Sequence, residues 1–303
     1  IISNFALING DKMRKILPII LAIGLVLASG AIGVERNKIA RQSANEVMLD
    51  NIEIKEENGY LILNAENAYY LHSGGKPMLP YYVKTYTFPL GTKVKVECEP
   101  LSVESVKISK KIMPAPYPTP LGGEPRFGED EIYDSNEFYP ENWYSYYTYG
   151  TVVNGEHVTL LSIHLFPVRY NPGESVIMHA DDFEINIDYE LPSEPVIKAD
   201  EYDLLIICPQ EWENEIESFV QHKENHGVRT LVETVENIYS SYDGRDGAEK
   251  VKYAIKDALE NYGIKYVLLA GGRKPGIKEE WLVPVRYSHL DDGSNWEKSY
   301  LRD

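Results

Sequence analysis

Residues 202–272 read YDLLIICPQEWENEIESFVQHKENHGVRTLVETVENIYSSYDGRDGAEKVKYAIKDALENYGIKYVLLAGG, and this stretch decides the fold. Apolar runs of strand length alternate in it with segments of helical period. Strands are expected at 203–208, 228–233 and 265–270, and helices at 211–226 and 246–262. The β-α-β-α-β order predicts a mostly parallel sheet with helices on its faces.

The two predicted helices have recognisable ends. Pro209 precedes the first helix and Gly227 suits its C-terminal cap, while Asp246 and Glu249 have the spacing of a capping box for the second. The expected buried face of the first helix consists of Trp212, Ile216, Phe219 and Val220. That of the second consists of Val251, Ile255, Ala258 and Leu259.

The preceding residues 51–191 follow a different pattern. Segments of period two, separated by Gly, Pro and Asn turns, predict an antiparallel all-β domain, either a sandwich or an open barrel. Asn154-Gly155 is a strong hairpin signal. Residues 111–149 are irregular and rich in Pro, Gly and Tyr, and we expect them to pack over the sandwich and close it. The alternative is that their tyrosines bind carbohydrate or peptide.

The N-terminal region has the layout of an export signal. A basic segment begins at Met13, an apolar core covers 16–28, and small residues follow at 29–31. The expected organisation is a leader (1–31) with a signal peptide (13–31), a linker (32–50), the β-rich domain (51–191), a second linker (192–200) and the α/β domain (201–303). An uncleaved membrane anchor is the alternative to a signal peptide.

Charge and cysteine content narrow the function further. The net charge of −17 argues against a nucleic-acid partner. Acidic loops at 291–295 and 243–246 are candidate calcium ligands, although both also suit ordinary turns. Cys98 and Cys208 are expected in different domains, which argues against a disulfide framework, and no motif of zinc-ligand spacing is present.

One residue pair superficially resembles a catalytic dyad. His226-Gly227 stands after the first predicted helix, and Cys208 ends the first predicted strand. We interpret both as structural, because His226 falls in the last turn of a helix and Cys208 closes an apolar strand.

Three blocks carry a resemblance to a known family: DLLIICP (203–209), FVQHKENHGVRTLVET (219–234) and AEKVKYAIKDALENYGIKYVLLAGG (248–272). Together they resemble the first part of the gingipain-type catalytic domain of peptidase family C25, which has a caspase-like α/β fold. Where that family commonly has Gly-Asp, this chain has Gly271-Gly272. Residues 75–96 and 158–191 also resemble the pro-region that precedes such domains, in the expected order.

The resemblance implies a secreted or cell-surface cysteine endopeptidase zymogen, which acts on protein and peptide substrates and whose pro-domain contacts the catalytic domain. The family's His-Cys dyad lies on later strands, so we assign no catalytic residue here and expect this chain to be inactive alone. We expect membrane contact only through the export signal. Arg126 and Lys198 are candidate processing residues, and Arg126 is alternatively a residue that plugs the active site. The alternative function is a non-catalytic exported surface or binding protein with a β-sandwich module.

Overall fold

A computed structural model describes residues 40–44, 52–119, 123–274, 280–289 and 298–300, without the side chains of 40–44, 287–289 and 298–300. The predicted signal peptide, the acidic loop at 291–295 and most of the first linker lie outside these residues. Within the described ranges, no helix has the length and apolar character needed to span a membrane.

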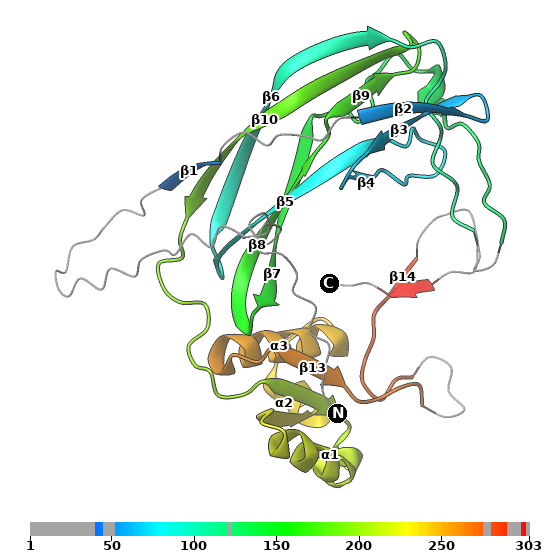
Figure 1. Ribbon diagram of the computed structural model, residues 1–303. Helices are drawn as coiled ribbons and strands as arrows, with labels where there is room; N and C mark the ends of the chain where they lie inside the picture. Colours follow the sequence, from blue (N-terminus) through cyan, green and yellow to red (C-terminus); the bar gives the residue numbers. More distant parts are fainter. Residues whose placement is uncertain (1–39, 45–51, 120–122, 275–279, 290–297, 301–303) are drawn as a thin grey trace, which may run out of the picture. The chain divides into compact units, whose positions relative to one another are not determined.

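The β-rich region contains two four-stranded antiparallel sheets (Figure 1). The first has the order β1-β10-β6, and β9 also pairs with β10. Its strands are β1 (Ala40–Ala44), β6 (Lys93–Lys107), β9 (Val168–Asn171) and β10 (Val176–Glu190). The second sheet has the order β4-β5-β8-β7. Its strands are β4 (Tyr69–Tyr70), β5 (Pro80–Pro89), β7 (Tyr144–Val153) and β8 (Glu156–Leu165).

The two sheets share one hydrophobic core. Alternate residues of β8, namely Leu161, Ile163 and Leu165, are fully buried in a cluster with Phe183, Ile185 and Ile187 of β10. The period of two in both sequences produces this packing, because every second side chain of a strand lies on the same face. The predicted antiparallel β architecture is therefore present.

Tight turns close two hairpins of the β-rich region. Asn154 and Gly155 join β7 to β8 with φ values of 52° and 85°, which confirms the predicted hairpin. Asn58 and Gly59 form the same kind of turn, with φ values of 51° and 84°. This second turn joins β2 (Ile52–Glu57) to β3 (Tyr60–Ala65).

Two predictions for this region were wrong in detail. Residues 144–149 belong to β7 rather than to an irregular stretch, because tyrosines occupy both faces and hide the alternation of polar and apolar residues. The sequence pattern predicts two separate strands in TKVKVECEP (92–100) and VESVKIS (103–109). The structure has one strand there, β6. Pro100 interrupts the sequence pattern but is tolerated, because β6 lies at the edge of its sheet.

The rest of the irregular stretch packs against the β-rich region through its own core. Ile112 and Tyr133 are buried in a cluster with Leu63, Leu79 and Tyr170. The Tyr133 hydroxyl donates to the carbonyl of Ile112 (2.7 Å), next to the short 3-10 helix η1 (Glu131–Asp134). Part of this stretch thus closes the sandwich, as the sequence predicts.

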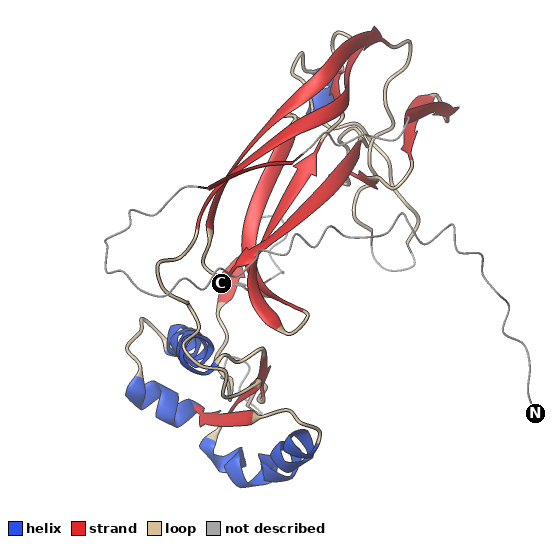
Figure 2. Ribbon diagram, turned by 60° about the vertical axis from the view of Figure 1, so that its left-hand side comes forward, coloured by secondary structure: helices blue, strands red, loops and turns tan. Residues whose placement is uncertain are grey.

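The α/β region has a three-stranded parallel sheet of order β12-β11-β13. Its strands are β11 (Leu204–Cys208), β12 (Thr230–Thr234) and β13 (Tyr266–Leu269). Its helices are η2 (Gln210–Trp212), α1 (Glu213–Asn225), α2 (Val235–Ser241) and α3 (Gly247–Tyr262). Figure 2 shows the helices beside the strands of this small sheet. A two-stranded pair follows, formed by β14 (Tyr287–His289) and β15 (Lys298–Tyr300).

Several details of the α/β region differ from the sequence prediction. Trp212 and Phe219 are 36% and 37% exposed, so α1 buries only Val220 fully. Helix α2 was not predicted, because its seven residues are too few to show a helical period. The four residues of β13 are 36% to 63% exposed, so the described residues cover this strand only in part. The capping box is confirmed in part: Asp246 accepts from the Glu249 amide, but the Glu249 carboxylate accepts from Arg245 instead.

Candidate functional site

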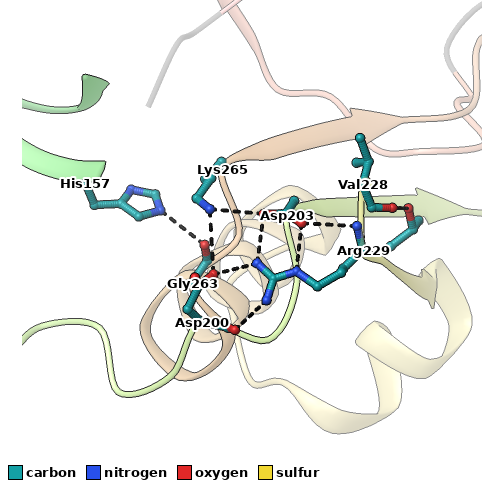
Figure 3. Close-up of polar contacts among 8 residues, drawn as sticks. His157, Asp200, Asp203, Val228, Arg229, Gly263 and Lys265 are labelled. Atoms are coloured by element: carbon teal, nitrogen blue, oxygen red, sulfur yellow. Dashed lines mark hydrogen bonds and ion pairs between the residues drawn. The ribbon is translucent and has the colours of Figure 1, made fainter. Parts of the chain in front are cut away.

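A cluster of charged residues joins the amino ends of the three parallel strands (Figure 3). Asp203, Arg229 and Lys265 each stand one residue before β11, β12 and β13, respectively. The guanidinium of Arg229 donates to both oxygens of Asp203 (Nε–Oδ2 2.8 Å, Nη2–Oδ1 2.9 Å) and to Asp200 Oδ1 (2.7 Å). Lys265 Nζ completes the cluster at 3.0 Å from Asp203 Oδ1.

The electrostatics of this cluster are those of a structural ion-pair network. The Arg229 hydrogen bonds, followed by those of Lys265, hold the pKa of Asp203 well below its ordinary range. Ligands bind at the carboxyl ends of parallel strands, whereas these residues lie at the amino ends. The cluster therefore positions the three strands and is not itself a site of chemistry.

The opposite, carboxyl edge of the sheet is where chemistry would be expected. Cys208 ends β11 there, and Glu236 follows β12 and accepts from the Gln210 amide (2.8 Å). Burial raises the pKa of the Cys208 thiol, and Glu213 and Glu236 raise it further. A nucleophilic cysteine needs the opposite environment, in which a nearby cation lowers its pKa. The thiol of Cys208 is thus fully buried and not activated.

The topology also separates His226 from Cys208. Helix α1 runs back from the carboxyl end of β11 to the amino end of the parallel strand β12, and His226 caps the end of that helix. His226 therefore lies at the amino edge, away from Cys208. Its Nδ1 contacts the His222 carbonyl (2.7 Å), and Gly227 follows with a φ of 77°. The structure supports the structural interpretation of both residues.

Arg126 lies on an exposed loop whose base is fixed. Its carbonyl accepts from the Tyr117 amide (2.8 Å) in an isolated antiparallel bridge. The Tyr117 ring packs on three glycines, since a Cβ at Gly74, Gly75 or Gly128 would lie 2.5–3.1 Å from it. The next residue, Phe127, is 57% exposed. Arg126 and Phe127 are therefore exposed at the surface, while the bridge to Tyr117 and the packing of the Tyr117 ring hold their backbone in place.

Lys198 lies in a predicted linker, but two hydrogen bonds tie it to α3. Its Nζ donates to Asn261 Oδ1 (2.8 Å), and its backbone amide donates to the Glu260 carbonyl (2.8 Å). Both partners belong to α3. Cleavage after Lys198 would require these two hydrogen bonds to open first.

The candidate calcium loop at 243–246 is already engaged in other contacts. Asp246 caps α3 through the Glu249 amide (2.8 Å) and receives Arg286 Nη2 at 2.9 and 3.0 Å. Of the residues that the structure describes, no three His, Cys, Asp or Glu side chains form a group that could hold a metal ion.

A family comparison matches the α/β region of the chain. Residues 197–302 match the model of peptidase family C25. The match covers about a third of the chain. Gingipain R2 of Porphyromonas gingivalis is 33% identical over 95 residues, which cover 28% of this chain and 12% of the relative. The chain thus matches only about an eighth of the length of that curated relative.

Two solved structures match parts of the chain. A structure that concerns the zymogenic latency of gingipain K from P. gingivalis matches with a TM-score of 0.41 and 16% identity, over 52% of this chain and 95% of that chain. The complex of RgpB pro- and mature domains from P. gingivalis matches with a TM-score of 0.40 and 14% identity, over 60% and 97%.

Sequence reasoning missed the strand-start cluster altogether. Its strand-start residues lie far apart in the sequence: Asp203 is 26 positions from Arg229 and 62 from Lys265. A weak signal was present, because each predicted strand has a charged residue at its beginning. It also missed the hydrogen bond between His157 Nε2 of β8 and the carbonyl of Gly263 (3.2 Å, Figure 3).

Proposed function

We propose that this chain is part of the zymogen of a secreted cysteine endopeptidase, with residues 51–191 as its pro-domain. Residues 201–303 then form the first part of a caspase-like catalytic domain. The observation that carries the proposal is the C25 match over 197–302. The parallel β11–β12–β13 sheet is consistent with such a domain. Export rests on the predicted signal peptide alone.

The chemistry implied by the family is nucleophilic attack on a peptide bond by a cysteine thiolate that a histidine activates. An acyl-enzyme forms, and water then hydrolyses it. Neither Cys208 nor His226 takes part, because the thiol is buried among acidic neighbours and the imidazole lies at the other edge of the sheet. We assign the dyad to other residues of the complete domain.

In this proposal the Tyr117–Arg126 loop keeps the zymogen latent. An exposed arginine beside an exposed phenylalanine has the character of a peptidase ligand, and its seated base limits the conformational entropy lost on docking. Lys198 remains a candidate site at which the pro-domain is released. Its backbone position between the two regions suits that role.

The test uses the full-length protein that contains this chain. Hydrolysis of a panel of fluorogenic peptides is measured before and after limited proteolysis, with and without iodoacetamide. We expect activity to rise on processing and to vanish on alkylation. Cys208→Ala is the matched control and should leave the activity unchanged. If no alkylation-sensitive activity exists in either form, the peptidase proposal fails.

One observation favours the alternative, a non-catalytic exported binding protein. A Cβ at Gly271 would lie 2.8 Å from Val283, so glycine is required there, but the space around Gly272 is open. The family's aspartate would fit at position 272, and its absence is therefore not forced by packing. Full-length protein without peptidase activity, but with retained binding of a surface ligand by residues 51–191, would support this function.

A further inference from the structure

The outer edges of the two β-sheets are built differently. Strand β6, at the edge of the first sheet, carries the charged residues Lys93, Lys95, Glu97, Glu99, Glu104 and Lys107. Pro100 lies within it, and its ladder with β10 is interrupted at Ser102, whose φ is 51°. Charge, proline and local distortion are the devices that keep an edge strand from pairing with another chain.

Strand β7, at the edge of the second sheet, has none of these devices (Figure 1). Its sequence, YSYYTYGTVV, contains no charged residue and no proline. All ten of its residues pair in register with β8, and among the described residues no strand pairs with its other side. Tyr146, Tyr147 and Tyr149 are 36%, 47% and 47% exposed. A long, uncharged edge of this kind is a template for strand addition.

We propose that β7 pairs antiparallel with β7 of a second copy of this chain, so that one sheet continues across a two-fold dimer. Antiparallel pairing of a strand with itself is a two-fold operation, the commonest symmetry of soluble oligomers. It opposes no like charges in any register, because the strand carries none. The two-fold places one residue of β7 opposite itself, so at most nine of its ten residues pair. They would exchange about eight to ten backbone hydrogen bonds, close to the number of direct bonds in a typical stable interface.

The side chains of β7 suit a partner of the same kind. Directly paired residues share a face, so Tyr146, opposite the buried Ile163, faces the core side. Tyr147, opposite Ser162, faces outward. Tyrosines therefore stand on both faces of the edge, and a second β7 would place tyrosines and threonines beside them on both. A charged peptide would find no charge on this strand to pair with.

The net charge of the chain predicts how the affinity of the dimer depends on salt. Each copy carries a net charge of −17, so two copies repel each other at long range. Added salt screens this repulsion but leaves hydrogen bonds and aromatic packing in place. The dimer should therefore become tighter as ionic strength rises, whereas a complex formed by opposite charges would weaken.

Sedimentation equilibrium of the whole chain at low and high salt tests the proposal. We expect a dimer that salt strengthens and that Tyr149→Lys weakens at least about tenfold. Val106→Lys is the matched control, since Val106 is 49% exposed on β6 and the charge change is the same. It should leave the dimer unchanged. A monomer at every concentration, or equal weakening by both variants, overturns the proposal.

Cross-linking gives a second readout that does not depend on a destabilising change. Single cysteines replace Ser145, Thr148 or Thr151, and a short bifunctional thiol reagent is added; Cys98 and Cys208 are buried and do not compete. Antiparallel self-pairing brings only one position opposite itself, so the yield should peak at one of the three. No cross-link, or an equal yield at all three, contradicts the pairing. Neither experiment uses peptidase activity, so the result is independent of the proposed function.

Discussion

Arg229 donates two parallel hydrogen bonds to Asp203, from Nε to Oδ2 at 2.8 Å and from Nη2 to Oδ1 at 2.9 Å. This bidentate pair joins the residue before β11 to the residue before β12. Arginine suits the position because its planar fork matches both carboxylate oxygens, which a lysine cannot do. The contact fixes the relative start of two parallel strands whose sequences are far apart.

Asp203→Asn should destabilise the α/β region by about 1–2 kcal/mol, because asparagine has no charge and only one acceptor oxygen, so the bidentate pair with Arg229 is lost. The check is urea unfolding followed by circular dichroism. Asp200→Asn is the control. Its side chain is 68% exposed, and the change should have a smaller effect. An equal loss in both variants would show that the bidentate geometry is unimportant.

The same pair predicts a pH dependence. The pKa of Asp203 is lowered in the folded state from its ordinary value of 3.8. Its contribution to stability is therefore complete above that value and is lost as the pH falls below it towards the lower folded pKa. Unfolding free energies measured through the acid range should fall less steeply in Asp203→Asn than in the wild type. Parallel curves would contradict the assignment.

Two glycines with the same backbone conformation allow a matched comparison. Gly227 and Gly263 follow α1 and α3 with φ values of 77° and 75°. A Cβ on Gly227 would meet nothing within 4 Å, but one on Gly263 would lie 2.6 Å from the Ala199 carbonyl oxygen. Gly227→Ala should cost about 1 kcal/mol through the left-handed backbone alone. Gly263→Ala should cost clearly more in thermal unfolding, and equal costs would show that the linker moves aside freely.

Cys208 should behave as a buried apolar residue. Its thiol should resist alkylation in the native protein and react once the protein is unfolded, as measured by mass spectrometry. Cys208→Ala should lower stability by about 1 kcal/mol, through the cavity it leaves. Rapid labelling of the native thiol would reopen a catalytic or redox role for Cys208.

Arg126 and Lys198 make separable predictions in the full-length zymogen. If the loop blocks the active site, Arg126→Ala should raise the activity of the unprocessed form, whereas Lys198→Ala should leave it latent. If release occurs after Lys198, Lys198→Ala should slow the appearance of the mature fragment on a gel. Unchanged latency and unchanged processing in Arg126→Ala would exclude that residue from both roles.

The sequence predicts those parts of the fold that depend on local periodicity. The apolar run at 204–208, the capping residue Asp246 and the Asn154-Gly155 turn each determine their own neighbourhood, and all three are found as expected. Periodicity reports that a face is apolar but not whether anything covers it. For this reason Trp212 and Phe219 were expected to be buried and are partly exposed.

Features set by long-range pairing were not predictable in the same way. The Asp203–Arg229–Lys265 cluster exists because three parallel strands start side by side, and only the sheet order brings those charges together. The extent of β7 depends on β8, which pairs with a tyrosine-rich segment that has no alternation of its own.

The bridge between Tyr117 and Arg126 has a consequence for the shape of whatever receives this loop. The backbone of Arg126 is tied to that of Tyr117 by this bridge. Neighbouring strands lie about 5 Å apart, so two backbones would have to enter side by side. A narrow slot made for one extended peptide would accept Arg126 only after the bridge had opened. A broad cleft would accept Arg126 with the bridge intact and the chain uncleaved.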